Sequence, residues 1–204
     1  MFAVVFLSSG AALIVYILSG ISLLWTLVGT LAVFGAVAAL IWRRADPERR
    51  AQLRRRVAAG VVAGIVATIA YDVSRFALIK LTGITFWPYD IFGIFGQGLI
   101  GRGASGWWVD VAGFAFHLTN GVGFAIAFTI VFGTRGILYG IGWALFLEAA
   151  MLTFYPGWLD IRAINEFVQV SIFGHLVYGS VLGYLARWLL VDGPLRERDE
   201  VPAT

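Results

Sequence analysis

Two histidines and two acidic residues stand out because each lies inside a long apolar run. His117 and His175 are the only histidines, and Asp72 and Glu148 interrupt similar stretches. A charge near the centre of a bilayer costs at least about 2.5 kcal/mol, so such residues usually face the interior of a helical bundle and mark a functional site. Counted at about 1.5 Å per residue from the ends of their runs, all four lie near mid-depth.

These four side chains are compatible with three kinds of site. His117, His175, Glu148 and Asp72 could be the ligands of a divalent metal ion, Zn²⁺, Mn²⁺ or Fe²⁺. A histidine beside a carboxylate could instead relay protons or hold a permeating cation. The two histidines could also ligate one haem. The neighbouring glycines would then give the ring room: Gly121, Gly174 and Gly179.

The same residues could also serve only to hold helices together. His117 and His175 can hydrogen-bond to Glu148, to Asn120 or to a backbone carbonyl. Asp72 lies three residues before Arg75, so the two can form an ion pair on one helix. Any function at these residues therefore requires that they meet in one pocket.

The composition predicts a helical membrane protein. Of the 204 residues, 60% are hydrophobic and 13% are charged, whereas soluble domains average about 25% charged residues. A helix needs about 20 mostly apolar residues to cross a bilayer, and lipid requires backbone polar groups to be bonded internally. We expect an all-α bundle with six transmembrane helices, at residues 2–18, 22–42, 57–82, 107–132, 136–156 and 167–190.

Four of these helices carry small residues at every fourth position, beside the polar residue. Such stripes let two helices approach closely in lipid. The stripes are Gly60, Gly64 and Thr68 before Asp72; Gly136, Gly140 and Ala144 before Glu148; Gly121 and Ala125 after His117; and Gly179 and Gly183 after His175. We expect a tightly closed inner half and a looser outer half. Aromatic residues such as Phe76, Phe114 and Phe154 would line the outer half.

The order of these features occurs twice, together with the related phrases ITFWPYDI (84–91) and LTFYPGWLDI (152–161). Residues 57–132 and 136–191 are therefore predicted to be a parallel internal duplication. The copies differ in spacing, because Asp72 precedes Thr85 by thirteen residues and Glu148 precedes Thr153 by five. The predicted organisation is a hairpin (1–42), a basic loop (43–56), a duplicated four-helix unit (57–191) and a tail (192–204).

Both phrases are expected to end a helix at the outer boundary. Proline disfavours helical geometry in the residue before it, and amphipathic rings favour the membrane interface. The expected belt is Trp87, Tyr89, Trp107, Trp108, Tyr155 and Trp158. Instead of serving only as part of this boundary, the two phrases could form an external entry site for cations through Asp90 and Asp160. Residues 91–106 are too short and glycine-rich to span, and are expected to cap the bundle.

The arginines predict the orientation. Seven lie in RRADPERRAQLRRR (43–56), and cytoplasmic loops retain basic residues, so this loop and both termini are predicted to be cytoplasmic, in a bacterial or archaeal inner membrane. Asp46 and Pro47 should begin a helix that continues into the third span. The loop could also bind anionic lipid headgroups, through Arg49, Arg50, Arg54, Arg55 and Arg56. Nucleic-acid binding is disfavoured because no aromatic reading surface accompanies the charge.

The last span, GHLVYGSVLGYLAR (174–187), resembles the closing helix of small prokaryotic integral membrane proteins that are grouped only as families of unknown function. The resemblance implies a prokaryotic membrane protein and no site residues. The absence of cysteine excludes disulfides and thiol catalysis, and familiar nucleotide and hydrolase motifs are missing. The leading expectation is a mid-membrane site that handles protons or a metal cation. The alternatives are a scaffold protein and a metal-dependent membrane enzyme. The chain could also form a homo-oligomer.

Overall fold

The computed structural model describes residues 2–196, and in this range every regular element is helical. The long helices are α1 (Ser8–Ser19), which extends the short helix η1 (Phe2–Leu7), then α2 (Leu23–Arg44), α3 (Pro47–Thr82), α5 (Trp107–Phe132), α6 (Ile137–Leu159) and α7 (Ile164–Arg187). The two remaining elements are α4 (Asp90–Ile100) and the π-helical turn η2 (Trp188–Asp192). Most of the predicted tail, residues 197–204, lies outside the described residues.

Six helical segments are long and apolar enough to cross a membrane, as predicted. The turn at LSGIS is confirmed, since α1 ends at Ser19 and Gly20 adopts a left-handed conformation with φ 71°. The predicted start of α3 is also confirmed. Asp46 accepts a hydrogen bond from the Arg49 amide at 2.7 Å, and Pro47 is the first helical residue. At about 1.5 Å per residue this helix is about 54 Å long, so its basic first turns extend beyond any apolar core.

The two copies of the repeated phrase differ in structure. Residues 83–89, which contain the first copy, form an irregular connection. In the second copy the prediction that proline ends the helix is wrong. Pro156 lies inside α6, which continues to Leu159. Asp160 follows as the C-cap residue, with φ 49°. A proline this close to a helix end removes one backbone hydrogen bond, which the helix tolerates as a local adjustment.

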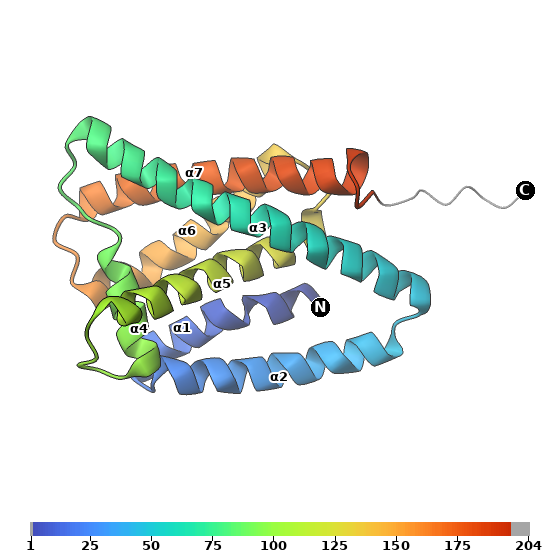
Figure 1. Ribbon diagram of the computed structural model, residues 1–204, viewed down its shortest axis with the longest axis horizontal. Coiled ribbons are helices and arrows are strands. Elements are labelled where there is room, and N and C mark those ends of the chain that lie inside the picture. The colour runs from blue at the N-terminus through green and yellow to red at the C-terminus, as the bar shows by residue number, and fades with distance from the viewer. Residues whose placement is uncertain (1, 197–204) are drawn as a thin grey trace, which may run out of the picture.

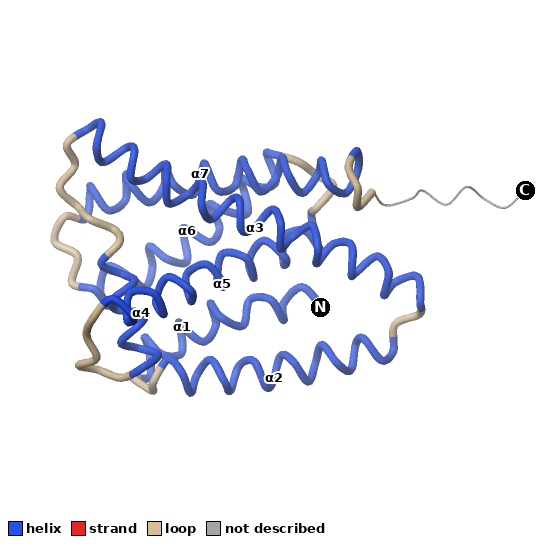
Figure 2. Tube along the Cα trace, in the orientation of Figure 1, coloured by secondary structure: helices blue, strands red, loops and turns tan. Residues whose placement is uncertain are grey.

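The helices form a bundle in which α3 packs against both α5 and α7, while α6 packs against α7 (Figure 1). The hairpin of η1, α1 and α2 lies on the α5 side. Figure 2 shows α4 crossing the end of the bundle opposite the α2–α3 connection, where it packs against α5. This placement agrees with the expectation that residues 91–106 cap the bundle. The first repeated phrase lies at this end in the connection of residues 83–89, and the second lies at the end of α6.

The small-residue stripes form close helix contacts, as the sequence predicts. In α6 and α7 the stripes meet directly, because a Cβ built on Gly140 would lie 2.1 Å from the Gly179 carbonyl oxygen and 2.8 Å from the Gly183 amide. In α3 and α5 a Cβ on Gly64 would lie 2.7 Å from the Ala125 side chain. Backbones this close gain dispersion energy that larger residues would prevent. The stripes therefore set how closely the acid and the histidine of each helix pair can approach.

We expect Gly140→Ala to weaken the α6–α7 contact by about 1–3 kcal/mol, because the added methyl group would overlap backbone atoms that cannot rotate away. Gly142→Ala is the matched control on the same helix, since nothing lies within 4 Å of a Cβ there. That substitution should be neutral or slightly stabilising. Thermal unfolding of both purified variants in the same detergent tests this, and equal unfolding temperatures would contradict it.

Candidate functional site

The first polar cluster joins α3 to α5 through Asp72. One carboxylate oxygen, Oδ2, lies 3.1 Å from Nε2 of His117, and the other, Oδ1, accepts a hydrogen bond from Nη2 of Arg75 at 2.7 Å. The predicted pair of Asp72 with Arg75 is therefore present, together with the predicted approach of a histidine. A single buried carboxylate balances the arginine and also serves the imidazole.

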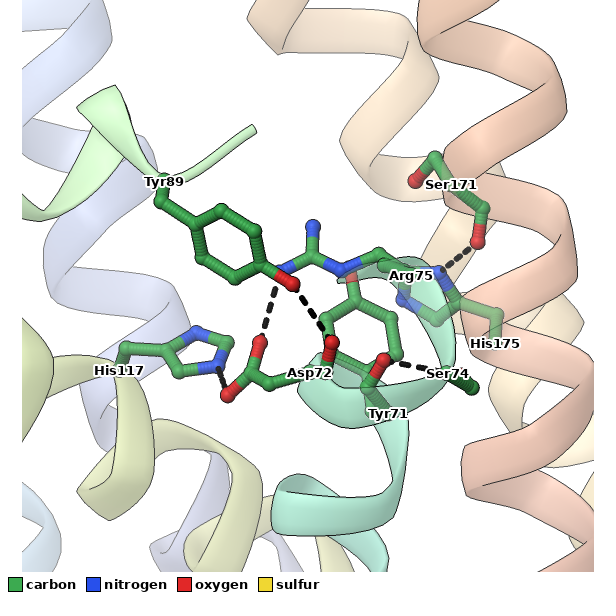
Figure 3. Close-up of polar contacts among 8 residues, drawn as sticks. All are labelled: Tyr71, Asp72, Ser74, Arg75, Tyr89, His117, Ser171 and His175. Atoms are coloured by element: carbon green, nitrogen blue, oxygen red, sulfur yellow. Dashed lines mark hydrogen bonds and ion pairs between the residues drawn. The ribbon is translucent and has the colours of Figure 1, made fainter. Parts of the chain in front are cut away.

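Two tyrosine rings cover Arg75. The guanidinium carbon lies 4.0 Å from the ring centroid of Tyr71 and 5.3 Å from that of Tyr89, distances at which cation–π attraction is effective. Tyr89 comes from the irregular connection after α3, and its hydroxyl donates to the backbone carbonyl of Asp72. Burial raises the pKa of this hydroxyl above its ordinary value, which keeps it a donor. Tyr89 was expected in the interfacial belt, and it instead points toward the arginine (Figure 3).

The second polar cluster joins α6 to α7. Oε2 of Glu148 lies 2.8 Å from Nδ1 of His175 and accepts a hydrogen bond of 2.8 Å from the hydroxyl of Ser171. The same ring nitrogen lies 2.9 Å from the backbone carbonyl of Ser171. Glu148 is only 2% exposed, and its Oε1 atom has no hydrogen-bond partner. This pair is drier than the first and contains no arginine.

Tyr71 lies between the two clusters and brings them into one layer (Figure 3). Its ring centroid is 6.0 Å from that of His117 and 5.0 Å from that of His175. The two imidazoles therefore share Tyr71 as a neighbour. Tyr178 packs edge-on against the same ring at 6.5 Å and donates to the carbonyl of Gly121 at 2.7 Å.

The four predicted ligands form two separate pairs. Within residues 2–196 the structure contains no group of three or more histidine, aspartate or glutamate side chains placed to hold one metal ion. Within the described residues, His117, His175, Glu148 and Asp72 therefore do not form a single centre, because Tyr71 of α3 lies between the two pairs.

A haem between the histidines does not fit this arrangement either. The Tyr71 ring stands between the two imidazoles, and each imidazole has a ring nitrogen committed to a carboxylate. The glycines that would have made room are already in contact with protein atoms. Gly121 faces Thr68, Gly174 faces Tyr71, and Gly179 faces the Gly140 backbone.

Both histidines line an internal cavity of about 400 Å³. Its wall is mostly apolar and comes from α1, α3, α4, α5, α6, α7 and the connection before α4. The polar side chains in the wall are grouped at the level of the two clusters: Thr68, Arg75, His117, Asn120, Ser171 and His175. This volume lies within the range of ligand-binding pockets, about 300–1,000 Å³.

The repeated phrase contributes aromatic residues to this cavity from both copies. Phe86 and Pro88 of the first copy line it, as do Phe154 and Tyr155 of the second. The expectation of an aromatic outer half is thus met by Phe154. It is wrong for Phe76 and Phe114, which are 46% and 39% exposed on the outside of the bundle. Tyr155, assigned to the interfacial belt, faces the cavity instead.

Several residues of the site were missed by sequence reasoning. Tyr71 and Ser171 carry no charge, so nothing distinguished them from packing residues until their neighbours were known. Glu166 was also missed. Its Oε2 accepts hydrogen bonds from the Thr85 amide, the Thr85 hydroxyl and the Phe86 amide at 2.7–2.9 Å, which ties the first phrase to the start of α7. An acidic residue at the start of a helix was the available signal.

The basic residues of the α2–α3 region are partly engaged with the protein itself. Arg50 donates to the carbonyls of Trp42 and Arg43, and Arg56 donates to the carbonyl of Ile130 near the end of α5. A cation at a helix C-terminus is favourable because the exposed carbonyls carry partial negative charge. Arg49 and Arg54 remain exposed.

No protein-family model matches this chain, and no curated protein or solved structure matches it. The resemblance of residues 174–187 to uncharacterised membrane proteins therefore stays a prediction. The function must be argued from the cavity and the two polar clusters.

We expect Asp72→Asn to destabilise the fold by about 3–5 kcal/mol, because it leaves the buried charge of Arg75 without an anionic partner. The double variant Asp72→Asn with Arg75→Met removes both charges and should recover part of that loss. Asp160→Asn is a control at an exposed position whose left-handed backbone asparagine also tolerates. Thermal unfolding of the unmutated protein, these three variants and Arg75→Met alone tests the coupling, and additive effects of the two substitutions would contradict it.

Proposed function

We propose that this protein is an integral membrane protein that takes up and releases protons at two histidine–carboxylate pairs, and that proton exchange accompanies the entry and exit of a solute in the cavity between them. The observation that supports this most is that His117 and His175, each paired with a carboxylate, line the same cavity. Imidazole is the side chain whose charge changes nearest to physiological pH.

A proton site fits the pairs better than a resident metal ion. Each pair offers one imidazole and one carboxylate, whereas structural and catalytic zinc sites use at least three protein ligands. A proton needs only one acceptor and a path to water or solute. Both imidazoles border the cavity, so a proton can reach them from its contents.

The scaffold alternative explains the hydrogen bonds but not the space around them. The pairs do connect α3 with α5 and α6 with α7. A bundle held together only by such contacts would gain from filling the cavity, because voids forfeit dispersion energy. Thr68 Oγ1, Arg75 Nε and Glu148 Oε1 are also buried without partners. Unpaired buried polar groups are costly, so their retention supports a role beyond adhesion.

We further propose that the two pairs are copies of one ancestral unit. In each copy the acid lies on the first helix and contacts the histidine on the second, and small stripes meet beside them, with the α6–α7 contacts shifted by one helical turn relative to those of α3 and α5. The arginine distribution supports an orientation with the α2–α3 connection in the cytoplasm of a prokaryotic cell. Headgroup binding by the exposed Arg49 and Arg54 remains part of this proposal.

We expect the ¹⁵N ring signals of both histidines to respond to pH over the range in which the protein stays folded, because both imidazoles border the cavity. The chain has only two histidines, so protein labelled with ¹⁵N-histidine and purified on a histidine-free tag gives ring signals from these two residues alone. His117→Gln and His175→Gln assign the signals. A spectrum recorded over this pH range in nanodiscs makes the measurement.

The scaffold alternative makes the opposite prediction for the same sample. Rings that serve only as structural hydrogen-bond partners keep one protonation state until the protein unfolds, and glutamine replaces them without consequence. Ser180→Ala is a control on α7, since its hydroxyl bonds only to the Leu176 carbonyl of its own helix. Unchanging ring signals across the range, with intact thermal stability, would refute proton exchange.

A further inference from the structure

The cavity has the two-part character of a site for an amphipathic molecule. One region of its wall holds the polar side chains of the two clusters. The rest is built from aliphatic and aromatic side chains, including Leu7, Ile14, Phe86 and Phe95. A solute with one polar end and an apolar body matches both regions, whereas an inorganic ion or a sugar would leave the apolar wall unused.

The polar end of the cavity carries a positive charge with an unused donor. Arg75 is 6% exposed and lines the cavity. Tyr71 and Tyr89 lie over its guanidinium, and Asp72 accepts from Nη2, but Nε has no partner. Guanidinium binds a carboxylate in its own plane through N–H donors. Asp72 already supplies an anionic partner for Arg75, so what the arginine lacks is an acceptor for Nε, which a carboxylate head group can supply.

The size of the cavity limits the apolar part to one chain. With about 400 Å³, the cavity lies toward the lower end of the range for ligand-binding pockets, about 300–1,000 Å³. A carboxylate with a chain of about ten carbons meets this limit. A phospholipid with two acyl chains exceeds it several times.

The wall also offers a route from the surface of the bundle. Phe146 lines the cavity and is 61% exposed on α6. The two helices at this wall, α1 and α6, share few contacts with each other. Only side chains close the cavity here, so a chain dissolved in lipid can enter between these helices.

We infer that the cavity binds a single-chain carboxylate amphiphile of medium length, with its carboxylate on Arg75 and its chain between α1 and α6. The binding geometry stands by itself, while the coupling of binding to protons rests on the proposed function. No covalent step is involved. The molecule differs from a membrane phospholipid in chain number and from a soluble anion in its apolar body.

The charges around the site link binding to protonation. The Arg75–Asp72 pair is neutral, so an added carboxylate meets the repulsion of Asp72. A proton on His117 offsets that repulsion, because Asp72 can then pair with the imidazolium while Arg75 holds the solute. Besides Asp72 and Arg75, the titratable groups around His117 and its neighbour Tyr71 are Tyr89, Tyr178, His175 and Glu148. Binding should therefore be accompanied by proton uptake.

The test uses the full-length protein in phosphatidylcholine nanodiscs with decanoate ¹³C-labelled at its carboxyl carbon. We expect a saturable bound signal that is missing from empty nanodiscs. Unlabelled decanoate should displace it, whereas decanol, which lacks the charge, and acetate, which lacks the chain, should not. Arg75→Gln should weaken binding about tenfold or more, as expected for loss of a charged hydrogen-bond donor.

Matched controls separate the head-group contact from general damage to the fold. Arg162→Gln removes an exposed arginine at the same end of the bundle, and this variant should bind decanoate normally. Ala150→Trp fills the apolar part of the cavity without touching Arg75 and should abolish binding. Ala149→Trp places the same bulk on the exposed face of α6 and should not. If Arg75→Gln fails to fold, the comparison of Ala150→Trp with Ala149→Trp still tests whether the chain lies in the cavity.

The outcomes distinguish this inference from the proton site. No saturable decanoate signal, or equal displacement by decanol, overturns the inference, and the histidine titration is judged separately. Equal binding by Ala150→Trp and Ala149→Trp also overturns it, because the chain then lies elsewhere. Decanoate binding without any change at the ¹⁵N-histidine signals supports the ligand and refutes the coupling.

Discussion

A buried positive charge that must be neutralised inside an apolar bundle constrains the rest of this structure. Arg75 reaches neutrality through Asp72, and the same carboxylate contacts His117 on the next helix. Because an unpaired charge in this environment is costly, α3 and α5 must hold their relative height and rotation for the pair to persist. The tyrosines over the guanidinium extend the constraint to the connection before α4, since Tyr89 can lie there only if that connection folds back over α3.

In the other half of the bundle, the small-residue stripes hold α6 and α7 close together. Apolar burial gives little association energy between helices in lipid, so close backbone contact must supply it. Gly140, Gly179 and Gly183 bring α6 and α7 into backbone contact, and Glu148 and His175 pair farther along the same two helices. The cavity begins where the stripes end. Tight contact and open space are thus arranged in sequence along the same helices, and the titratable pairs lie at the boundary.

Much of this architecture could be predicted from the sequence because its physical signals are local. Apolar run length gave the six spans, Asp46 and Pro47 gave the start of α3, and spacing by four identified the helix faces that meet. Pairing of Asp72 with Arg75 followed from their separation on one helix. The separation of the four polar residues into two pairs was not predictable, because it depends on Tyr71, an uncharged residue one position from Asp72, occupying the space between them. The helical conformation around Pro156 was missed because it depends on non-local packing, in which Tyr155 and Trp158 contact the cluster of Ala12, Leu13, Leu23, Phe95 and Phe116.

The two copies differ in a way that gives each pair a distinct role. Four residues before the histidine, α7 has Ser171, which bonds Glu148, whereas α5 has Gly113. A Cβ at Gly113 would overlap the carbonyl of Phe92, so glycine is required there for α4 to approach α5. The α3–α5 pair therefore has no hydroxyl donor at this position, and its acid is bonded by Arg75 instead. Among the described residues no arginine or lysine contacts Glu148, so its charge can be balanced only by a proton on itself or on His175. In the proposed function, the first pair therefore meets an anion beside Arg75, and the second pair exchanges protons.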